Sequence, residues 1–317
     1  MATFLSSISS VVVILLMILL GYILQRKGWF AATFGNNISK LITQIALPAS
    51  IFISVQQNLT RSSLLALLED MLVPFLGVIL SYIFAFILVK ALRVPIGRRG
   101  TFINTIANAN TIFIGMPLNI ALFGNKAMPY FLIYYVINTV STWGFGVFLI
   151  KNDNLNREKK GYKLDLKKIL PMPLVGFIVA VIWLLTDWQL PKFASETFTY
   201  VGNLVTPLSL IYIGIVLANS GIKNIKIDTD TLWALIGRFI FAPAAVAILI
   251  HSSGLIHLAV PELMGQTFIV QAATPALSVL PILANEAHGD VDYATNVVVL
   301  STLLFVIVIP ILMFIVQ

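Results

Sequence analysis

The stretch NANTIFIGMP, from Asn108 to Pro117, interrupts an apolar segment with three polar residues, a glycine and a proline. Proline lacks a backbone N–H and clashes with the carbonyl four residues before it, while glycine tolerates unusual dihedral angles. Gly115 and Pro117 therefore predict that the helix expected over residues 101–123 unwinds around 111–117 and then restarts. A broken helix inside an apolar segment is typical of a membrane protein with a buried polar site.

A second apolar segment, residues 262–285, is interrupted in a similar way by QAATPA, from Gln271 to Ala276. Pro275 predicts a second break, entering from the opposite side of the membrane. Each restarted half-helix is expected to point its N-terminus at the membrane centre. Because a helix N-terminus bears about half a positive charge and free N–H donors, two of them together favour an anion.

The amino-acid composition indicates whether the protein is soluble or membrane-bound. The chain has 317 residues, of which 59% are hydrophobic and 10% charged, whereas soluble domains have about 25% charged residues. Mean hydropathy is +0.96. These values exclude a soluble or disordered chain and indicate a multi-pass membrane protein. With no cysteine there is no disulfide framework or cysteine nucleophile, and we expect no nucleic-acid partner.

The hydropathy predicts an all-α membrane protein with ten transmembrane helices, because each apolar stretch is near the roughly 20 residues that cross a bilayer. The ten expected spans are 5–25, 38–57, 64–89, 101–123, 127–150, 169–186, 198–219, 231–251, 262–285 and 293–316.

The basic residues predict the orientation in the cell membrane. Of the 20 Lys and Arg residues, 16 fall in odd-numbered connections between spans and three in even-numbered ones. Seven of them lie in the loop 151–168. Because cytoplasmic loops are enriched in Lys and Arg, the odd connections are expected to be cytoplasmic and both termini outside. The bilayer is the expected partner of this basic loop.

The loop 151–168 separates two groups of five spans, residues 1–150 and 169–317. Prolines recur at similar offsets across this divide, and the pairs are Pro48 with Pro207, Pro74 with Pro243, and Pro117 with Pro275. Five is an odd number, so two related halves must be inverted relative to each other. Inverted repeats with broken, crossed helices four and nine are typical of a secondary transporter.

The positions of the charged side chains limit the classes of transporter that the chain could be. All 13 Asp and Glu residues fall in connections or near span ends, which weakens a cation or proton antiporter. Arg238 lies inside span eight, roughly 10 Å deep at about 1.5 Å per residue. Two interpretations stay open: its side chain extends to the membrane surface, or it balances substrate charge. No catalytic or metal-binding motif is present, so we expect no enzyme activity, cofactor or metal.

Four stretches resemble the auxin efflux carrier family, especially its bacterial malate permease-like branch. They are GYILQRKGWF (21–30), SKLITQIALPASIF (39–52), NANTIFIGMPLNIALFG (108–124) and ATPALSVLPILANEAHGD with STLLFVIVIP (273–310). The resemblance implies two inverted five-helix repeats, with spans 1, 2, 6 and 7 as a scaffold containing a homodimer contact. Spans 3–5 and 8–10 would form a moving transport domain, with helices crossing at Pro117 and Pro275. The central loop is shorter than in many plant members, which favours a small organic acid over auxin.

We therefore expect a secondary carrier for a small organic anion, malate first and malonate or another dicarboxylate next. The residues expected to bind it are Asn110, which matches the substrate-site Asn of the family, with Thr111, Gln271, Thr274, Ser50, Thr206, Asn138 and Arg238. Uptake is expected to follow the singly charged acid and to need no sodium. The alternative is a sodium-coupled symporter of the bile-acid-carrier type, and a membrane enzyme or passive scaffold is less favoured.

Overall fold

The computed structural model describes residues 2–31, 33–61, 70–153, 172–219, 226–256 and 260–316. Within these ranges the regular structure is helical, and strand-like pairing is confined to one isolated bridge between Ala109 and Ala276. Most of the expected basic loop, residues 154–168, lies outside the described residues.

The chain forms two compact units, each drawn from both halves of the sequence. Unit 1 consists of Met1–Asp70, Met116–Leu132 and Leu170–Ile222, and unit 2 of Met71–Gly115, Ile133–Ile169 and Lys223–Gln317. The expected scaffold spans 1, 2, 6 and 7 fall in unit 1. The expected transport spans fall in unit 2, except for residues 64–70 and 116–132, which belong to unit 1.

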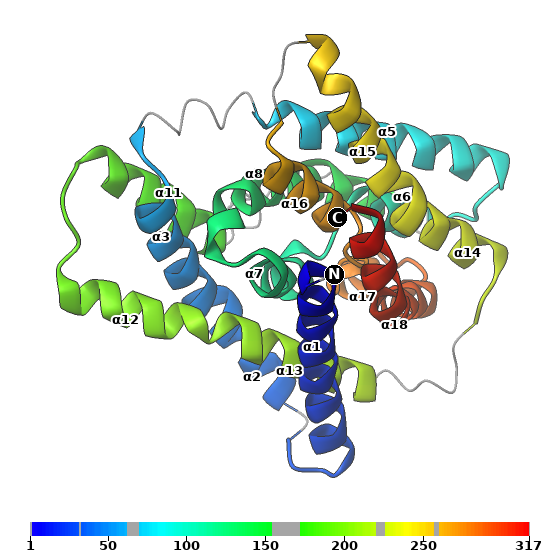
Figure 1. The fold of residues 1–317 in the computed structure, drawn as a ribbon. Helices are drawn as coiled ribbons and strands as arrows, with labels where there is room; N and C mark the ends of the chain where they lie inside the picture. Colours follow the sequence, from blue (N-terminus) through cyan, green and yellow to red (C-terminus); the bar gives the residue numbers. More distant parts are fainter. Residues whose placement is uncertain are drawn as a thin grey trace. The chain divides into compact units, whose positions relative to one another are not determined.

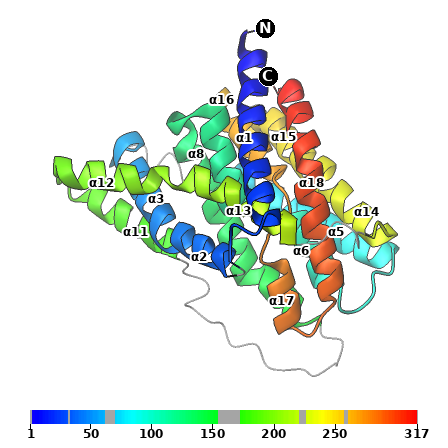
Figure 2. The same ribbon diagram turned by 90° about the horizontal axis from the view of Figure 1, so that it is seen from below.

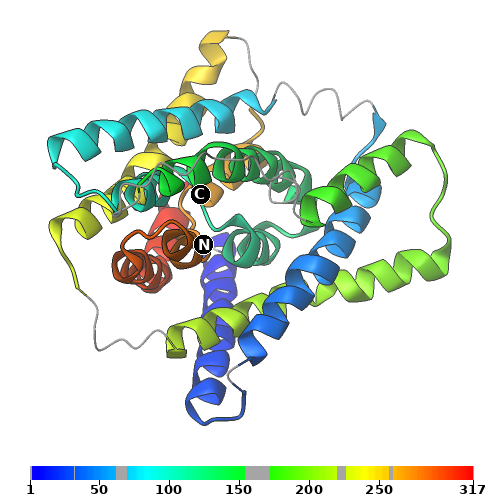
Figure 3. The same cartoon turned by 180° about the vertical axis from the view of Figure 1, so that it is seen from behind.

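The helices of unit 1 pack in two groups. Their bounds are α1 (Ala2–Arg26), α2 (Phe34–Leu41), η1 (Ile42–Ala46), α3 (Leu47–Asn58), α7 (Met116–Phe123), η3 (Asn125–Ala127), α11 (Met172–Leu185), α12 (Lys192–Asn203) and α13 (Val205–Asn219). Helix α3 lies against α11 and α12 (Figures 2 and 3). Helix α1 crosses α13 (Figure 1) where Gly21 and Gly214 let the two backbones touch, since a Cβ on either glycine would overlap the other helix.

Unit 2 is built around the broken helices. Its elements are α5 (Leu72–Ala91), α6 (Arg99–Ala107), η2 (Thr111–Gly115), most of α8 (Met128–Val140), η4 (Ser141–Gly146), α9 (Val147–Lys151), α14 (Thr229–Ile236), η6 (Gly237–Phe241), α15 (Ala242–Ser252), η7 (Ser253–Ile256), α16 (Glu262–Ala272), α17 (Leu280–Glu286) and α18 (Val291–Val316). Its apolar core gathers around Phe102 and Ile106 of α6, with Leu280 and Val297 from the second half of the chain.

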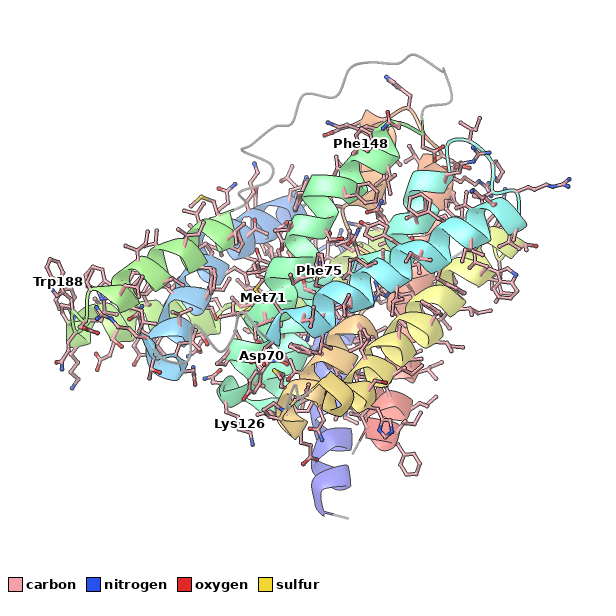
Figure 4. All side chains as sticks on the ribbon, turned by 90° about the horizontal axis from the view of Figure 1, so that it is seen from above. Asp70, Met71, Phe75, Lys126, Phe148 and Trp188 are labelled. Atoms are coloured by element: carbon pink, nitrogen blue, oxygen red, sulfur yellow. The ribbon has the colours of Figure 1, made fainter. Side chains whose placement is uncertain are left out.

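Several helices present apolar side chains outward, as a lipid environment requires. On α5, Phe75, Ile83 and Ile87 are exposed at helical spacing while Val78 and Tyr82 are buried. Figure 4 shows Phe75 pointing away from α5, and Trp188 standing clear at the turn after α11. An apolar stripe exposed on a long helix is stable only against lipid or a partner.

Five helical segments are long and apolar enough to cross a membrane: Phe34–Asn58, Leu72–Ala91, Asn125–Lys151, Lys192–Asn219 and Thr229–Ser252. A sixth is counted if the bent pair Val291–Phe305 and Ile307–Val316 is one span. The described part of the chain therefore belongs to a multi-pass membrane protein. Helix is present in all ten expected spans, but ten crossings and the division into repeats stay a prediction.

Four odd-numbered connections meet at one end of unit 2. Arg98 binds Asp228 at 2.7 Å and Asp290 at 2.6 Å, and lies 3.5 Å from Asp230. We call these four residues the Arg98 cluster. Beside it, the Asp153 carboxylate accepts the N–H groups of Gly97 and Gly100 at the start of α6. Burial raises the pKa of Asp153 despite these hydrogen bonds.

Candidate functional site

Both predicted helix breaks exist, and within unit 2 they pair with each other. Helix α6 ends at Ala107 and η2 begins at Thr111, while α16 ends at Ala272 and α17 begins at Leu280. The N–H of Asn110 donates to the Pro275 carbonyl at 2.9 Å, next to the antiparallel bridge between Ala109 and Ala276. We call this pairing the crossover.

The first break lies earlier than expected. The sequence predicts unwinding around residues 111–117, but the non-helical residues are Asn108–Asn110, and Gly115 and Pro117 are helical. Pro117 lacks a backbone N–H, and the π-helical turn η2 before it accommodates this loss by a wider hydrogen-bonding pattern. The helix therefore continues through the proline. The break lies instead where polar side chains can form hydrogen bonds with the backbone N–H and C=O groups that lose their helical partners.

Asn138 satisfies the backbone of the first break. Its Oδ1 accepts the Ala109 N–H at 2.8 Å, and its Nδ2 donates to the Ala109 carbonyl at 2.9 Å and to Thr111 Oγ1 at 3.3 Å. In the second break, the N–H of Ala276 donates to Ser301 Oγ at 3.2 Å. Asn138 was expected to touch substrate, but its amide is occupied in holding the crossover.

A buried polar network next to the first break was not expected from the sequence. Asn108 Nδ2 donates to the Tyr82 hydroxyl at 2.8 Å and to Asn104 Oδ1 at 2.7 Å, and Ser141 Oγ donates to Asn108 Oδ1 at 2.6 Å. The spacing of Asn104 and Asn108, four residues apart on one helix face, was the available signal.

Asn110 begins the restarted helix. Its Oδ1 accepts the N–H of Phe113 at 3.3 Å, which is the hydrogen bond of a helix N-cap, and its backbone carbonyl accepts from Gly115 at 3.0 Å. The side chain is 6% exposed. With the oxygen engaged, the amide Nδ2 is the end of Asn110 suited to donate to an anion.

Gln271 lies flat against Gly115. Its Nε2 donates to the Gly115 carbonyl at 3.0 Å, and a Cβ on Gly115 would overlap Gln271 Oε1. Gly115 is therefore needed for this close approach and not for unusual dihedral angles. Thr274 Oγ1 donates to the Gln271 carbonyl at 2.9 Å and caps the end of α16. The Thr274 hydroxyl hydrogen and one N–H of Gln271 are therefore used within the crossover, while Gln271 Oε1 has no hydrogen-bond partner among the described residues.

Arg238, in η6, is completely buried. Its Nη2 donates to the carbonyl of Ala272, the last residue of α16, and its side chain lies beside Tyr134. The Nε and Nη1 atoms have no hydrogen-bond partner, and no carboxylate of the described residues pairs with this guanidinium. The interpretation in which Arg238 extends to the membrane surface is therefore wrong, because its side chain is buried and donates to the Ala272 carbonyl.

The expected second helix N-terminus at Thr274–Pro275 is also corrected. At this point the structure has the C-terminus of α16, and the chain becomes helical again only at Leu280 in a helix of seven residues. A helix C-terminus is electronegative, which suits the contact between Arg238 and Ala272. The positive charge of the crossover thus comes from Arg238 and the start of η2, since the second N-terminus is absent here.

Ser50 and Thr206 belong to unit 1 and are not part of the crossover geometry. Ser50 lies where Gly202 of α12 approaches α3, so its surroundings are packing contacts, and Thr206 is half-buried near the start of α13. Unit 1 also contains Asn119 of α7, fully buried, whose amide has no hydrogen-bond partner among the described residues. As the single amide within MPLNIALF, it was visible in the sequence but not selected.

Among the described residues, no group of three His, Cys, Asp or Glu side chains could hold a metal ion. The arrangement at the crossover is instead a buried cation with free donors, beside an amide and a helix start. Guanidinium and amide N–H groups are strong hydrogen-bond partners for carboxylate oxygens, so these groups are chemically suited to an anion.

The fold and the crossover define a multi-pass membrane protein with paired broken helices. Residues 6–313 match the family model described as "Membrane transport protein", so the chain belongs to this family. The resemblance to the auxin efflux carrier family is thereby confirmed. Two archaeal relatives are an uncharacterized transporter of Methanothermobacter thermautotrophicus and one of Methanocaldococcus jannaschii. The first is 24% identical over 97% of this chain and 97% of its own, and the second 23% identical over 94% and 95%. The family is one of transporters and not of enzymes.

Proposed function

We propose that this protein is a secondary carrier for a small organic anion, malate first and malonate or another dicarboxylate next, working by alternating access. The observation that supports the proposal is Arg238, a fully buried cation at the crossover with two unpaired nitrogen atoms. A buried charge is costly unless it is paired, and a substrate carboxylate would provide the pair.

The remaining polar groups of the crossover fit the same substrate. Asn110 can donate from Nδ2 while its oxygen caps η2, and Thr111 lies at the positive start of that helix. Gln271, Thr274 and Asn138 are proposed to support the site by holding its backbone. All of these side chains are at most 6% exposed, so access requires a change of conformation.

The fuller architecture is part of the proposal: ten crossings in two inverted repeats, with unit 1 as a scaffold that also makes a homodimer. Support comes from the antiparallel bridge between Ala109 and Ala276, since such a pair has a local twofold axis. Asn138 and Ser301 then support the two breaks in corresponding ways, each from the span that follows.

The test is uptake by purified protein in liposomes, across a panel of organic acids with and without sodium or a pH gradient. We expect saturable uptake of a small carboxylate in sodium-free buffer. In Arg238→Gln, affinity should fall about 10- to 150-fold, the loss expected for hydrogen bonds of roughly 1.5–3 kcal/mol to a charged group.

Ser81→Ala is the matched control, because Ser81 is buried in α5 and, among the described residues, its hydroxyl donates to the Gly77 carbonyl of its own helix. This variant should retain wild-type affinity. Uptake that disappears without sodium would favour the sodium-coupled symporter, and an Arg238→Gln protein with wild-type affinity would remove Arg238 from the site.

A further inference from the structure

The net charge of the crossover follows from its contents. The first break contributes the C-terminal end of α6 and the start of η2, whose partial charges offset each other, and the second contributes the C-terminal end of α16, which contacts Arg238. These dipole ends add no formal charge to the site. Asn110, Thr111, Gln271 and Tyr134 are neutral. The described crossover therefore has one positive charge, that of Arg238, because a guanidinium does not lose its proton in proteins.

We infer that Arg238 matches the site to a singly charged anion, so that the loaded site is neutral and the empty site carries one positive charge. This inference rests on the proposed function. A doubly charged substrate would leave a buried negative charge, which is costly in the same way as the unpaired cation. The chemical class is thus a monocarboxylate or a dicarboxylic acid with one carboxyl group protonated.

The charge of the site decides which half of the transport cycle depends on membrane potential. In alternating access the site faces one side of the membrane and then the other, so any net charge on it moves through the potential. For one charge, a potential of 100 mV corresponds to about 2.3 kcal/mol, which changes the ratio of the two orientations about 50-fold. Reorientation of the empty site should therefore depend on voltage, and reorientation of the loaded site should not.

Exchange and net uptake separate these two steps. Exchange of labelled for unlabelled substrate uses the loaded site alone, whereas net uptake also requires the empty site to return. The experiment measures both in liposomes clamped at 0 and −100 mV with potassium and valinomycin. The probe is labelled malate at a pH midway between its two pKa values, where the singly charged form predominates.

We expect the exchange rate to be the same at both potentials within about twofold, and net uptake to change several-fold. At higher pH, where malate is doubly charged, any residual exchange should become voltage-dependent. Arg238→Lys should keep the wild-type pattern because it keeps the charge. Arg238→Gln, where active, should invert the pattern, with voltage-dependent exchange.

Wild-type exchange that depends on voltage as strongly as net uptake would overturn the inference, whatever the variants do. Because this comparison uses the unmodified protein, an unstable Arg238→Gln does not affect the decision. Absence of uptake for every organic acid would instead overturn the proposed function itself. The two failures are therefore distinguishable.

Discussion

The oxygen and the nitrogen of the Asn110 side-chain amide are proposed to have different roles. Its oxygen caps η2 through the Phe113 N–H, and its amide nitrogen is the end suited to substrate. A single substitution to alanine removes both, so it cannot separate folding from binding. A serine keeps a short side-chain oxygen for the cap and removes the amide group.

We predict that Asn110→Ser keeps the thermal stability of the wild type but weakens substrate affinity about 10-fold or more. Asn110→Ala should lose affinity and also about 0.5–2 kcal/mol of stability, the usual cost of a lost N-cap. Melting curves in detergent and initial uptake rates measure the two effects. The control is Asn203→Ser, on an exposed position of α12. Wild-type affinity in Asn110→Ser would contradict the assignment.

At the scale of helices, three of the π-helical turns share one cause. The turns η1, η2 and η6 each end two residues before a proline, namely Pro48, Pro117 and Pro243. A proline offers no N–H to the carbonyl four residues earlier, and a π turn redistributes the remaining hydrogen bonds. Prolines in these spans therefore widen the helix locally instead of breaking it. In η6 the widened turn contains Arg238.

The Arg98 cluster ties α6, α14 and the start of α18 together within unit 2. Asp228 also caps α14 by accepting the Thr231 N–H at 2.8 Å. Partial burial alone would raise the pKa of Asp228, but the hydrogen bonds from Thr231 and Arg98 outweigh it, so the pKa is lowered. Its stabilising effect is therefore complete above its ordinary pKa of about 3.9 and is lost as the pH falls below that value.

We predict that Asp228→Asn, which keeps the cap, lowers stability at pH 7 by up to about 1 kcal/mol, because the ion pair is partly screened by solvent. The difference from the wild type should shrink as the pH is lowered below about 4. Detergent melting curves over a pH series measure it, with Asp292→Asn as the control in the exposed first turn of α18. A difference that persists unchanged in acid would show that charge is not the cause.

At the scale of the molecule, the basic residues predict both termini outside and the 151–168 loop inside. The native chain has no cysteine, so single cysteines can be labelled without background. We predict that an impermeant maleimide on intact cells labels Ser195→Cys and not Asn156→Cys, and that both react after the cells are opened. The reverse pattern on intact cells would overturn the orientation.

The sequence by itself determined the class of protein, the positions of the apolar segments and the existence of two helix breaks. These features depend on composition and on local backbone chemistry, both of which the amino-acid sequence specifies directly. It also selected Asn110, Arg238 and the Gln271–Pro275 stretch as the polar centre.

Only the tertiary structure decided where the first break falls, what Asn138 and Gln271 bind, and where Arg238 points. Each depends on a partner far away in sequence: Ala109 for Asn138, Gly115 for Gln271, and Ala272 for Arg238. A buried backbone group must find a hydrogen-bond partner, and the side chain that supplies it is chosen by three-dimensional packing and not by spacing along the chain.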